Sequence, residues 1–109
     1  MKPLHCVSTP AADQDAEAIA EYYARESGED LVIRFLLALD QATEFIRRNP
    51  EAGSLRHFRN PRLKGLRSWP VQGFEDVRLY YLRREEKTIR IVRILHGKRD
   101  VARILEQET

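Results

Sequence analysis

The stretch RIVRILHGKRD, residues 90–100, decides the fold because it places basic side chains inside an apolar strand. Its apolar residues are typical of a central strand that is covered on both faces. Burying an unpaired guanidinium is unfavourable, so an arginine on a covered face needs a carboxylate or several carbonyl groups as partners. We therefore expect at least one of Arg90 and Arg93 to point into an uncovered concavity.

Strict alternation along this strand predicts which side chains share a face. One face then carries Ile89, Ile91, Arg93 and Leu95, and the other carries Arg90, Val92, Ile94 and His96. Each face would mix apolar and basic residues.

Two further strand-like runs precede this one, over residues 63–71 and 75–84, and the last run covers residues 87–96. The connections QGF and RREEK are short enough for an antiparallel meander. In the middle run, alternation places Arg78 on the same face as Tyr80 and Leu82. A short strand candidate over residues 4–8 lies near the start of the chain.

Two helices are predicted between the first strand candidate and the meander. The first starts near Pro10, which suits the first helical turn, and ends at Gly28. The second covers Glu29–Arg48, where apolar residues recur at helical spacing, and stops before Pro50. Because the connection ESGED is short, the two helices should form an antiparallel hairpin.

The fold class is therefore α+β, in the order β-α-α-β-β-β, with the helical hairpin packed on one face of a small antiparallel sheet. The other face is expected to be partly open. Residues 100–106 add a short C-terminal helical turn. A chain of 109 residues is long enough for one core, so residues 1–109 should form a single domain.

Composition narrows the function classes. With 42% hydrophobic and 33% charged residues the chain is typical of a globular protein. Cys6 is the single cysteine, which rules out an internal disulfide and fits a reducing compartment. No apolar run approaches the length of a membrane span, so a cytoplasmic protein is expected. No metal, cofactor or nucleotide motif is present.

The charge is unevenly distributed although the formal net charge is only +2. Residues 1–54 hold five Lys or Arg against ten Asp or Glu, whereas residues 55–109 hold fourteen against seven. A basic half attracts nucleic acid or an acidic protein segment.

With these elements the sequence resembles the ParE/RelE superfamily, the toxin components of bacterial type II toxin-antitoxin systems. The resemblance rests on the acidic first helix, NPEAG at residues 49–53, G-x-x-x-x-R-L-Y-Y around Arg78 and, most specifically, RILHGKRD at residues 93–100. It covers nearly the whole chain and is closer to the ParE branch. It implies a toxin that is not an enzyme and that poisons DNA gyrase, a type II topoisomerase.

The RelE branch, whose members cleave ribosome-bound messenger RNA, stays open as the alternative. Arg78 and Arg99 match arginines of that branch, and His96 could act as acid or base because imidazole titrates near neutral pH. If the chain is an endoribonuclease, these three residues are its candidate catalytic residues. However, the branch's paired lysine motif is missing, and Leu105 stands where a tyrosine is expected.

Either branch implies a cognate antitoxin, expected to be a ribbon-helix-helix protein with an acidic C-terminal segment that folds on the toxin. The predicted antitoxin- and target-binding residues are basic, namely Arg67, Arg78, Arg93, Lys98 and Arg99. A homodimer and a toxin-antitoxin heterotetramer both stay open as assemblies.

Overall fold

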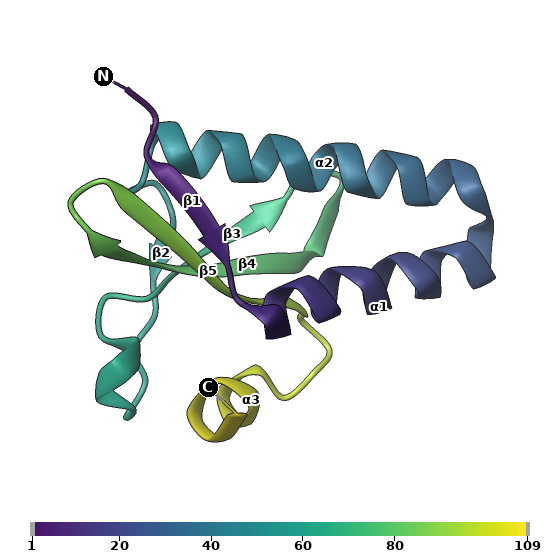
Figure 1. The fold of residues 1–109 in the computed structure, drawn as a ribbon. Helices are drawn as coiled ribbons and strands as arrows, with labels where there is room; N and C mark the ends of the chain where they lie inside the picture. The colour runs from purple at the N-terminus through teal and green to yellow at the C-terminus, as the bar shows by residue number, and fades with distance from the viewer. Residues whose placement is uncertain (1, 109) are drawn as a thin grey trace.

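A computed structural model describes residues 2–108 (Figure 1). Its strands are β1 (His5–Ser8), β2 (Ser54–Leu55), β3 (Arg67–Val71), β4 (Phe74–Glu85) and β5 (Thr88–His96). Its helices are α1 (Pro10–Ser27), α2 (Glu29–Arg48) and α3 (Val101–Glu108), with a 3-10 turn, η1 (Pro61–Leu63), in the connector before β3. The predicted α+β class and the predicted bounds of the second helix are confirmed.

The five strands form one mixed sheet in the order β1-β5-β4-β3-β2. Strands β2 to β5 pair antiparallel, as the meander predicted, whereas β1 lies parallel to β5 at the edge. The expectation of a purely antiparallel sheet was therefore wrong for β1. A parallel neighbour needs a long crossover, and the helical hairpin together with the meander supplies that connection.

A β-bulge in β5 changes which of its side chains share a face. The register between β4 and β5 shifts between Tyr80 and Tyr81, so that one extra residue, Val92, is accommodated in β5. As a result Ile91 and Ile94 both belong to the core under the helices, while Val92 and Leu95 belong to the core on the opposite face. The strict alternation expected for this strand was therefore wrong beyond Ile91.

Local capping explains how the helical hairpin forms and where it attaches. The Thr9 hydroxyl accepts a hydrogen bond from Ala12 N at 3.0 Å and donates one to Val92 O at 2.7 Å, which joins the start of α1 to β5. Gly28 lies between the helices with φ of 86°, a conformation that glycine adopts without a steric penalty. The chain can thus reverse direction in a single residue.

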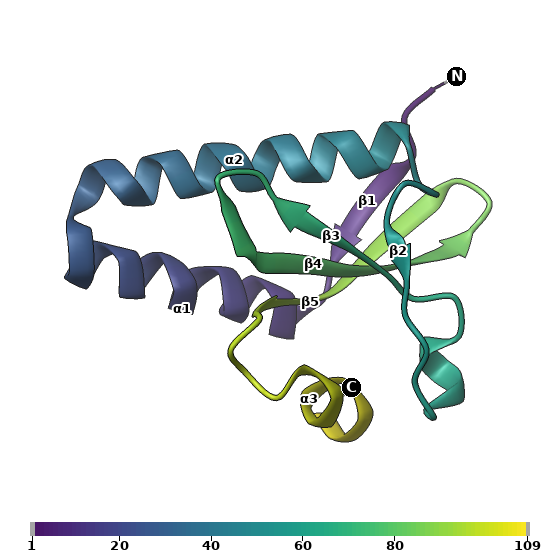
Figure 2. The same ribbon diagram turned by 180° about the vertical axis from the view of Figure 1, so that it is seen from behind.

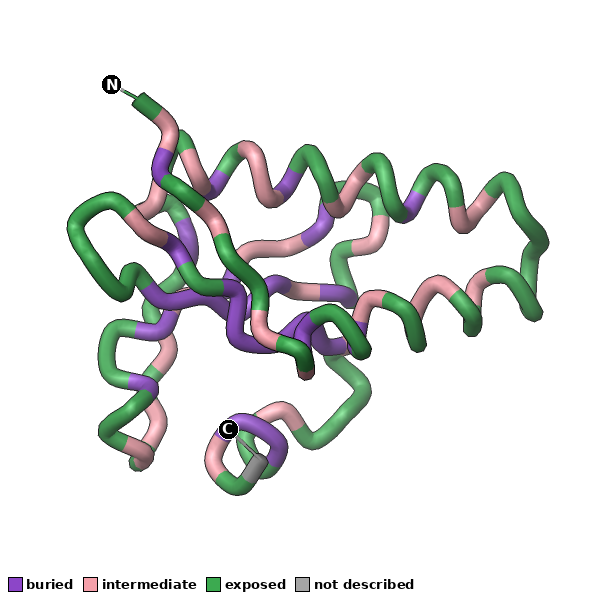
Figure 3. The backbone as a smooth tube through the Cα atoms, viewed as in Figure 1, coloured by how far each residue is buried: buried purple, intermediate pink, exposed green. Residues whose placement is uncertain are grey.

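The main core lies between this hairpin and one sheet face. Phe35 and Ile46 of α2 are fully buried against strand residues such as Leu79 and Ile89. Tyr23, Phe35 and Phe74 form an aromatic cluster with ring centroids 5.3–5.4 Å apart. Figure 3 shows this buried layer along the central strands.

A second core covers the face that was expected to be partly open. Ile104 and Leu105 of α3 and Leu63 and Leu66 of the connector pack against Tyr80 and its neighbours. Figures 1 and 2 show α3 lying apart from the helical hairpin, below the sheet. The C-terminal element is therefore a full helix of eight residues, and this side of the sheet is largely covered.

Candidate binding surface

Asp15 and Arg93 form a buried ion pair where α1 passes β5. Arg93 donates from Nε and Nη2 to the Asp15 carboxylate at 2.7 and 2.8 Å, and Asp15 and Arg93 are only 8% and 7% exposed. The same carboxylate accepts a hydrogen bond from Ile94 N at 3.0 Å. Because β1 pairs with β5 only as far as Ile91, Asp15 provides an acceptor for the strand edge beyond it.

This pair buries the Arg93 guanidinium, whereas the other predicted binding residues are partly or fully exposed. Its guanidinium does not point into an uncovered concavity, because the first helix supplies the carboxylate that a buried arginine needs. Sequence reasoning did not identify Asp15 as that partner.

The turn after β5 brings three other candidates together. Gly97 N donates to Asp76 O at 2.6 Å, Lys98 N donates to His96 Nδ1 at 3.2 Å, and Arg99 N donates to His96 O at 3.0 Å. These bonds define the path of the chain between β5 and α3. Lys98 and Arg99 are exposed, and they lie beside His96 next to α1.

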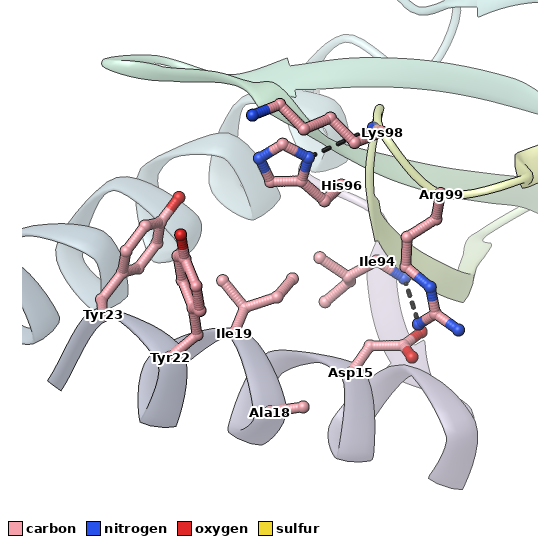
Figure 4. Close-up of a pocket in the computed structure, with 9 residues that line it drawn as sticks. All are labelled: Asp15, Ala18, Ile19, Tyr22, Tyr23, Ile94, His96, Lys98 and Arg99. Atoms are coloured by element: carbon pink, nitrogen blue, oxygen red, sulfur yellow. Dashed lines mark hydrogen bonds between the residues drawn. The ribbon is translucent and has the colours of Figure 1, made fainter. Parts of the chain in front are cut away.

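A hollow of about 370 Å³ separates this turn from α1 (Figure 4). We call it the α1–β5 groove; it is lined by Asp15, Ala18, Ile19, Tyr22, Tyr23, Ile94, His96, Lys98 and Arg99. In Figure 4 the tyrosine rings and Ile19 rise from α1, with His96 and Lys98 opposite them. The groove therefore has an apolar wall and a basic wall.

The tyrosines of the groove differ in their environment. Tyr22 is 49% exposed. Burial raises the pKa of Tyr23, and nearby Tyr22 and Asp76 raise it further. Its hydroxyl therefore stays protonated at neutral pH and can donate a hydrogen bond. Ile19, Tyr22 and Tyr23 are three and four residues apart, and this spacing places them side by side on one face of α1.

Arg67 lies elsewhere, next to the loop that follows α2. Its Nη1 donates to Glu51 O at 3.1 Å and to Gly53 O at 2.8 Å. In the same loop Gly53 N donates to Tyr81 Oη at 3.0 Å, and Tyr81 Oη donates to Pro50 O at 2.9 Å. Arg67 thus helps to hold the NPEAG segment against the sheet.

Arg78 lies on the face of the sheet that α3 covers. It alternates along β4 with Val77 and Leu79, which belong to the core under the helices. His96 pairs with Val77 and lines the α1–β5 groove, so Arg78 and His96 leave the sheet on opposite sides. The structure therefore does not bring the three candidate RelE-like catalytic residues together; only His96 and Arg99 share a site.

Near Arg78 the structure shows a polar cluster that sequence reasoning missed. Arg78 Nε lies 3.3 Å from Ser68 Oγ, and Arg56 Nη1 lies 3.4 Å from the same oxygen. The Arg56 guanidinium also lies over the Tyr80 ring, 5.7 Å from its centroid. The pairing of Ser68 with Tyr80 across β3 and β4 was not evident before the register was known.

Residues 2–108 show neither a metal site nor a membrane-spanning helix. There, no group of three or more His, Cys, Asp or Glu side chains gathers in a way that would hold a metal ion. No helix in that range combines the length and the apolar character that crossing a membrane requires. Burial raises the pKa of the Cys6 thiol, which disfavours the reactive thiolate.

Comparisons with known proteins place this chain in a family. No curated protein sequence matches the chain. A solved structure described as the chromosomal ParDE TA system from P. aeruginosa is similar, with a TM-score of 0.68 and 19% identity over 85% of this chain and 95% of that one. The family model for the ParE toxin of the type II toxin-antitoxin system, parDE, matches residues 7–101. That match spans most of the chain, and the chain therefore belongs to the ParE toxin family.

Proposed function

We propose that this ParE-family toxin inhibits growth by binding DNA gyrase and trapping it on DNA, and that a cognate antitoxin neutralises it. The observation that supports a binding toxin over an RNA-cleaving one is the position of Arg78 and His96 on opposite faces of the sheet. The choice of gyrase as the target follows the ParE resemblance.

Cleavage of RNA requires a general acid or base and a cationic group at one phosphate. A candidate base must be within hydrogen-bond reach of the proton that it removes, directly or through one water. Side chains that leave a sheet on opposite faces cannot meet at one phosphate, because the buried cores and the sheet itself lie between them. The geometry thus favours inhibition by binding.

The α1–β5 groove is our candidate for the antitoxin site. A segment that folds on binding needs apolar anchors to offset the entropy that it loses, and acidic side chains to match basic ones. The groove offers both, with Ile19 and Tyr22 on one wall and Lys98 and Arg99 on the other. An amphipathic acidic segment of a ribbon-helix-helix antitoxin fits this composition.

The gyrase proposal is tested with purified toxin, gyrase and relaxed plasmid in the presence of ATP. We expect loss of supercoiling and accumulation of protein-linked linear DNA. A parallel reaction with ribosomes and messenger RNA should leave the RNA intact. Full supercoiling activity at toxin excess, together with cleaved RNA, would instead support the RelE-like endoribonuclease.

Cells provide an independent readout. Induction of a gyrase poison should trigger the DNA-damage response and filamentation, with translation continuing at first. A ribonuclease toxin should stop translation before any DNA damage is seen. Co-expression of the antitoxin should reverse either effect, and the mass of the purified complex distinguishes a heterotetramer from simpler assemblies.

A further inference from the structure

The cluster around Ser68 contains two guanidinium groups and one neutral acceptor. Ser68 is completely buried, and its oxygen is within 3.4 Å of both Arg56 and Arg78. Among residues 2–108, no carboxylate forms an ion pair with either arginine. Two planar guanidiniums provide several N–H donors each, so most of the donors and all of the positive charge at this cluster are left for an anion.

The fold holds the two arginines close together despite their like charge. The Ser68 hydroxyl oxygen accepts a hydrogen bond from each arginine. The Tyr80 ring, which is 2% exposed, packs against the Arg56 guanidinium. Both arginines are partly exposed, so their remaining donors are accessible from solvent. An oxyanion placed between the two guanidinium groups would accept hydrogen bonds from both and offset the repulsion between their positive charges.

The surface around this pair is basic over a wider area. No Asp or Glu occurs between Glu51 and Glu75, and the connector before β3 contains Arg56, Arg59, Arg62 and Lys64. Arg56, Arg59 and Arg103 also line an open hollow of about 910 Å³ between the connector and α3, together with Glu106, whose carboxylate accepts a hydrogen bond from Arg59 N. An excess of cations near the pair suits a polymer of repeated negative charges better than a single carboxylate.

The composition of this face distinguishes a nucleic acid from an acidic peptide. Its large apolar side chains, including Leu63, Leu66 and Ile104, are at most 2% exposed because α3 and the connector cover them. An antitoxin segment would find few apolar anchors here, unlike in the α1–β5 groove. A phosphodiester backbone needs none, because counterion release drives its binding.

We propose that Arg56 and Arg78 bind a phosphodiester group of a nucleic-acid backbone, with Ser68 as the positioning residue between them. This contact reads no base and breaks no bond, since His96 lies on the opposite face of the sheet. It goes beyond the proposed gyrase function and can be tested without gyrase or antitoxin.

The test measures fluorescence anisotropy of the full-length toxin with a labelled DNA duplex of about 20 base pairs and a single-stranded RNA of similar length, between about 50 and 200 mM salt. The clamp variant is Arg56→Gln/Arg78→Gln. The matched control is Arg34→Gln/Arg83→Gln, which removes the same charge from exposed positions outside this cluster. DNA and RNA share the phosphodiester group, so the probe that binds more tightly identifies which of the two nucleic acids the toxin prefers.

We expect the clamp variant to bind at least about tenfold more weakly and to lose about one unit from the slope of log K against log salt, because the two arginines neutralise one phosphate and each phosphate contact contributes about 0.9. The control should stay within about twofold of wild type. The variant Arg56→Lys/Arg78→Lys keeps the charge but not the forked donors. This Lys variant should bind more weakly than wild type with the same slope of log K against log salt. It also tests the proposal if the Gln variant does not fold.

Three outcomes would overturn the proposal. The first is no binding of duplex or RNA by wild type at about 50 mM salt. The second is an equal loss in the clamp and control variants, which would reflect net charge alone. The third is competition by polyglutamate as effective as that by unlabelled DNA at the same charge concentration, which would assign the cluster to an acidic protein segment.

Discussion

Asp15 and Arg93 stand 78 positions apart in sequence, yet they form a two-pronged ion pair at 2.7 and 2.8 Å inside the protein. The Asp15 carboxylate also accepts from Ile94 N, so one side chain holds both a buried charge and a strand edge. This pair connects α1 to the sheet at the base of the α1–β5 groove.

Replacing Asp15 with Asn should strongly destabilise the fold. Arg93 would keep its buried charge without a counter-charge, and breaking one side of a buried pair typically costs about 3–5 kcal/mol. Urea unfolding followed by circular dichroism measures the change. Asp13→Asn is the matched control, because Asp13 is exposed and its carboxylate accepts a hydrogen bond from Ser8 Oγ at the end of β1.

The double variant Asp15→Asn/Arg93→Met separates the charge effect from the loss of the hydrogen bond to Ile94 N. It removes the unpaired guanidinium and keeps an acceptor for Ile94 N, so most of the stability should return. A double variant as unstable as Asp15→Asn would contradict the assignment of the effect to buried charge.

Tyr81→Phe should change both the stability and its dependence on pH. Gly53 N and Pro50 O lose their partner, and a buried unsatisfied group costs about 1–3 kcal/mol. Burial raises the pKa of Tyr81 above the ordinary value of 10.0, so the folded state holds the phenol proton more tightly than the unfolded chain. That contribution is complete below pH 10.0 and is lost as pH rises through the raised pKa.

Unfolding free energies between neutral and strongly alkaline pH test this linkage. Wild type should lose stability more steeply above pH 10.0 than Tyr81→Phe does. Parallel curves for wild type and Tyr81→Phe would contradict this prediction, because they would mean that the pKa of Tyr81 is the same in the folded and unfolded states.

Gly53→Ala should destabilise the loop after α2. An added Cβ would lie 2.5 Å from Tyr81 Oη and 2.9 Å from Ser68 O, closer than van der Waals contact allows. Overpacking of this kind costs about 1–3 kcal/mol. In a double-mutant cycle with Tyr81→Phe the two losses should be less than additive, because the phenylalanine removes the nearest atom. Strict additivity would place the strain at Ser68 O instead.

Reversing charge at the turn after β5 should weaken the antitoxin complex. Lys98→Glu/Arg99→Glu places two acids opposite the proposed acidic segment, and we expect the dissociation constant to rise more than about tenfold, with a smaller rise at high salt. Isothermal titration calorimetry provides the measurement. Arg34→Glu/Arg83→Glu carries the same change in net charge and should have little effect. An unchanged constant for the first variant would remove the turn from the interface.

Truncating the apolar wall should have a comparable effect without a change in stability. Tyr22→Ala removes an exposed ring from the groove, and we expect about tenfold weaker antitoxin binding, equal to about 1.4 kcal/mol. The melting temperature should stay within about 1 °C of wild type, because the ring is 49% exposed. Unchanged affinity would show that the antitoxin does not contact this part of α1.

Much of the fold was predictable because local signals agreed with one another. The apolar residues at helical spacing along Glu29–Arg48 predicted the bounds of α2. The alternation along β4 correctly placed Arg78 on the same face as Tyr80 and Leu82. In contrast, strict alternation failed in β5, since a bulge depends on pairing with another strand. Nothing local to residues 90–96 indicates it.

The binding residues were harder to predict for a similar reason. The acidic face of the first helix offers Asp13, Asp15 and Glu17 as partners for Arg93, and only the crossing of α1 over β5 selects Asp15. Likewise, Arg56 and Arg78 lie 22 positions apart and meet because Ser68 pairs with Tyr80. Spacing along the chain carries no information about such long-range registers.

The shortness of the edge strands has a consequence for how copies of the toxin behave at high concentration. Unpaired strand edges invite chains to polymerise through backbone hydrogen bonds. Beyond β1, the side chains of Thr9 and Asp15 already occupy Val92 O and Ile94 N of β5. Beyond β2, the outer edge of β3 contains Pro70, which has no N–H to donate. Both margins of the sheet therefore resist fibril-like stacking of one toxin on another.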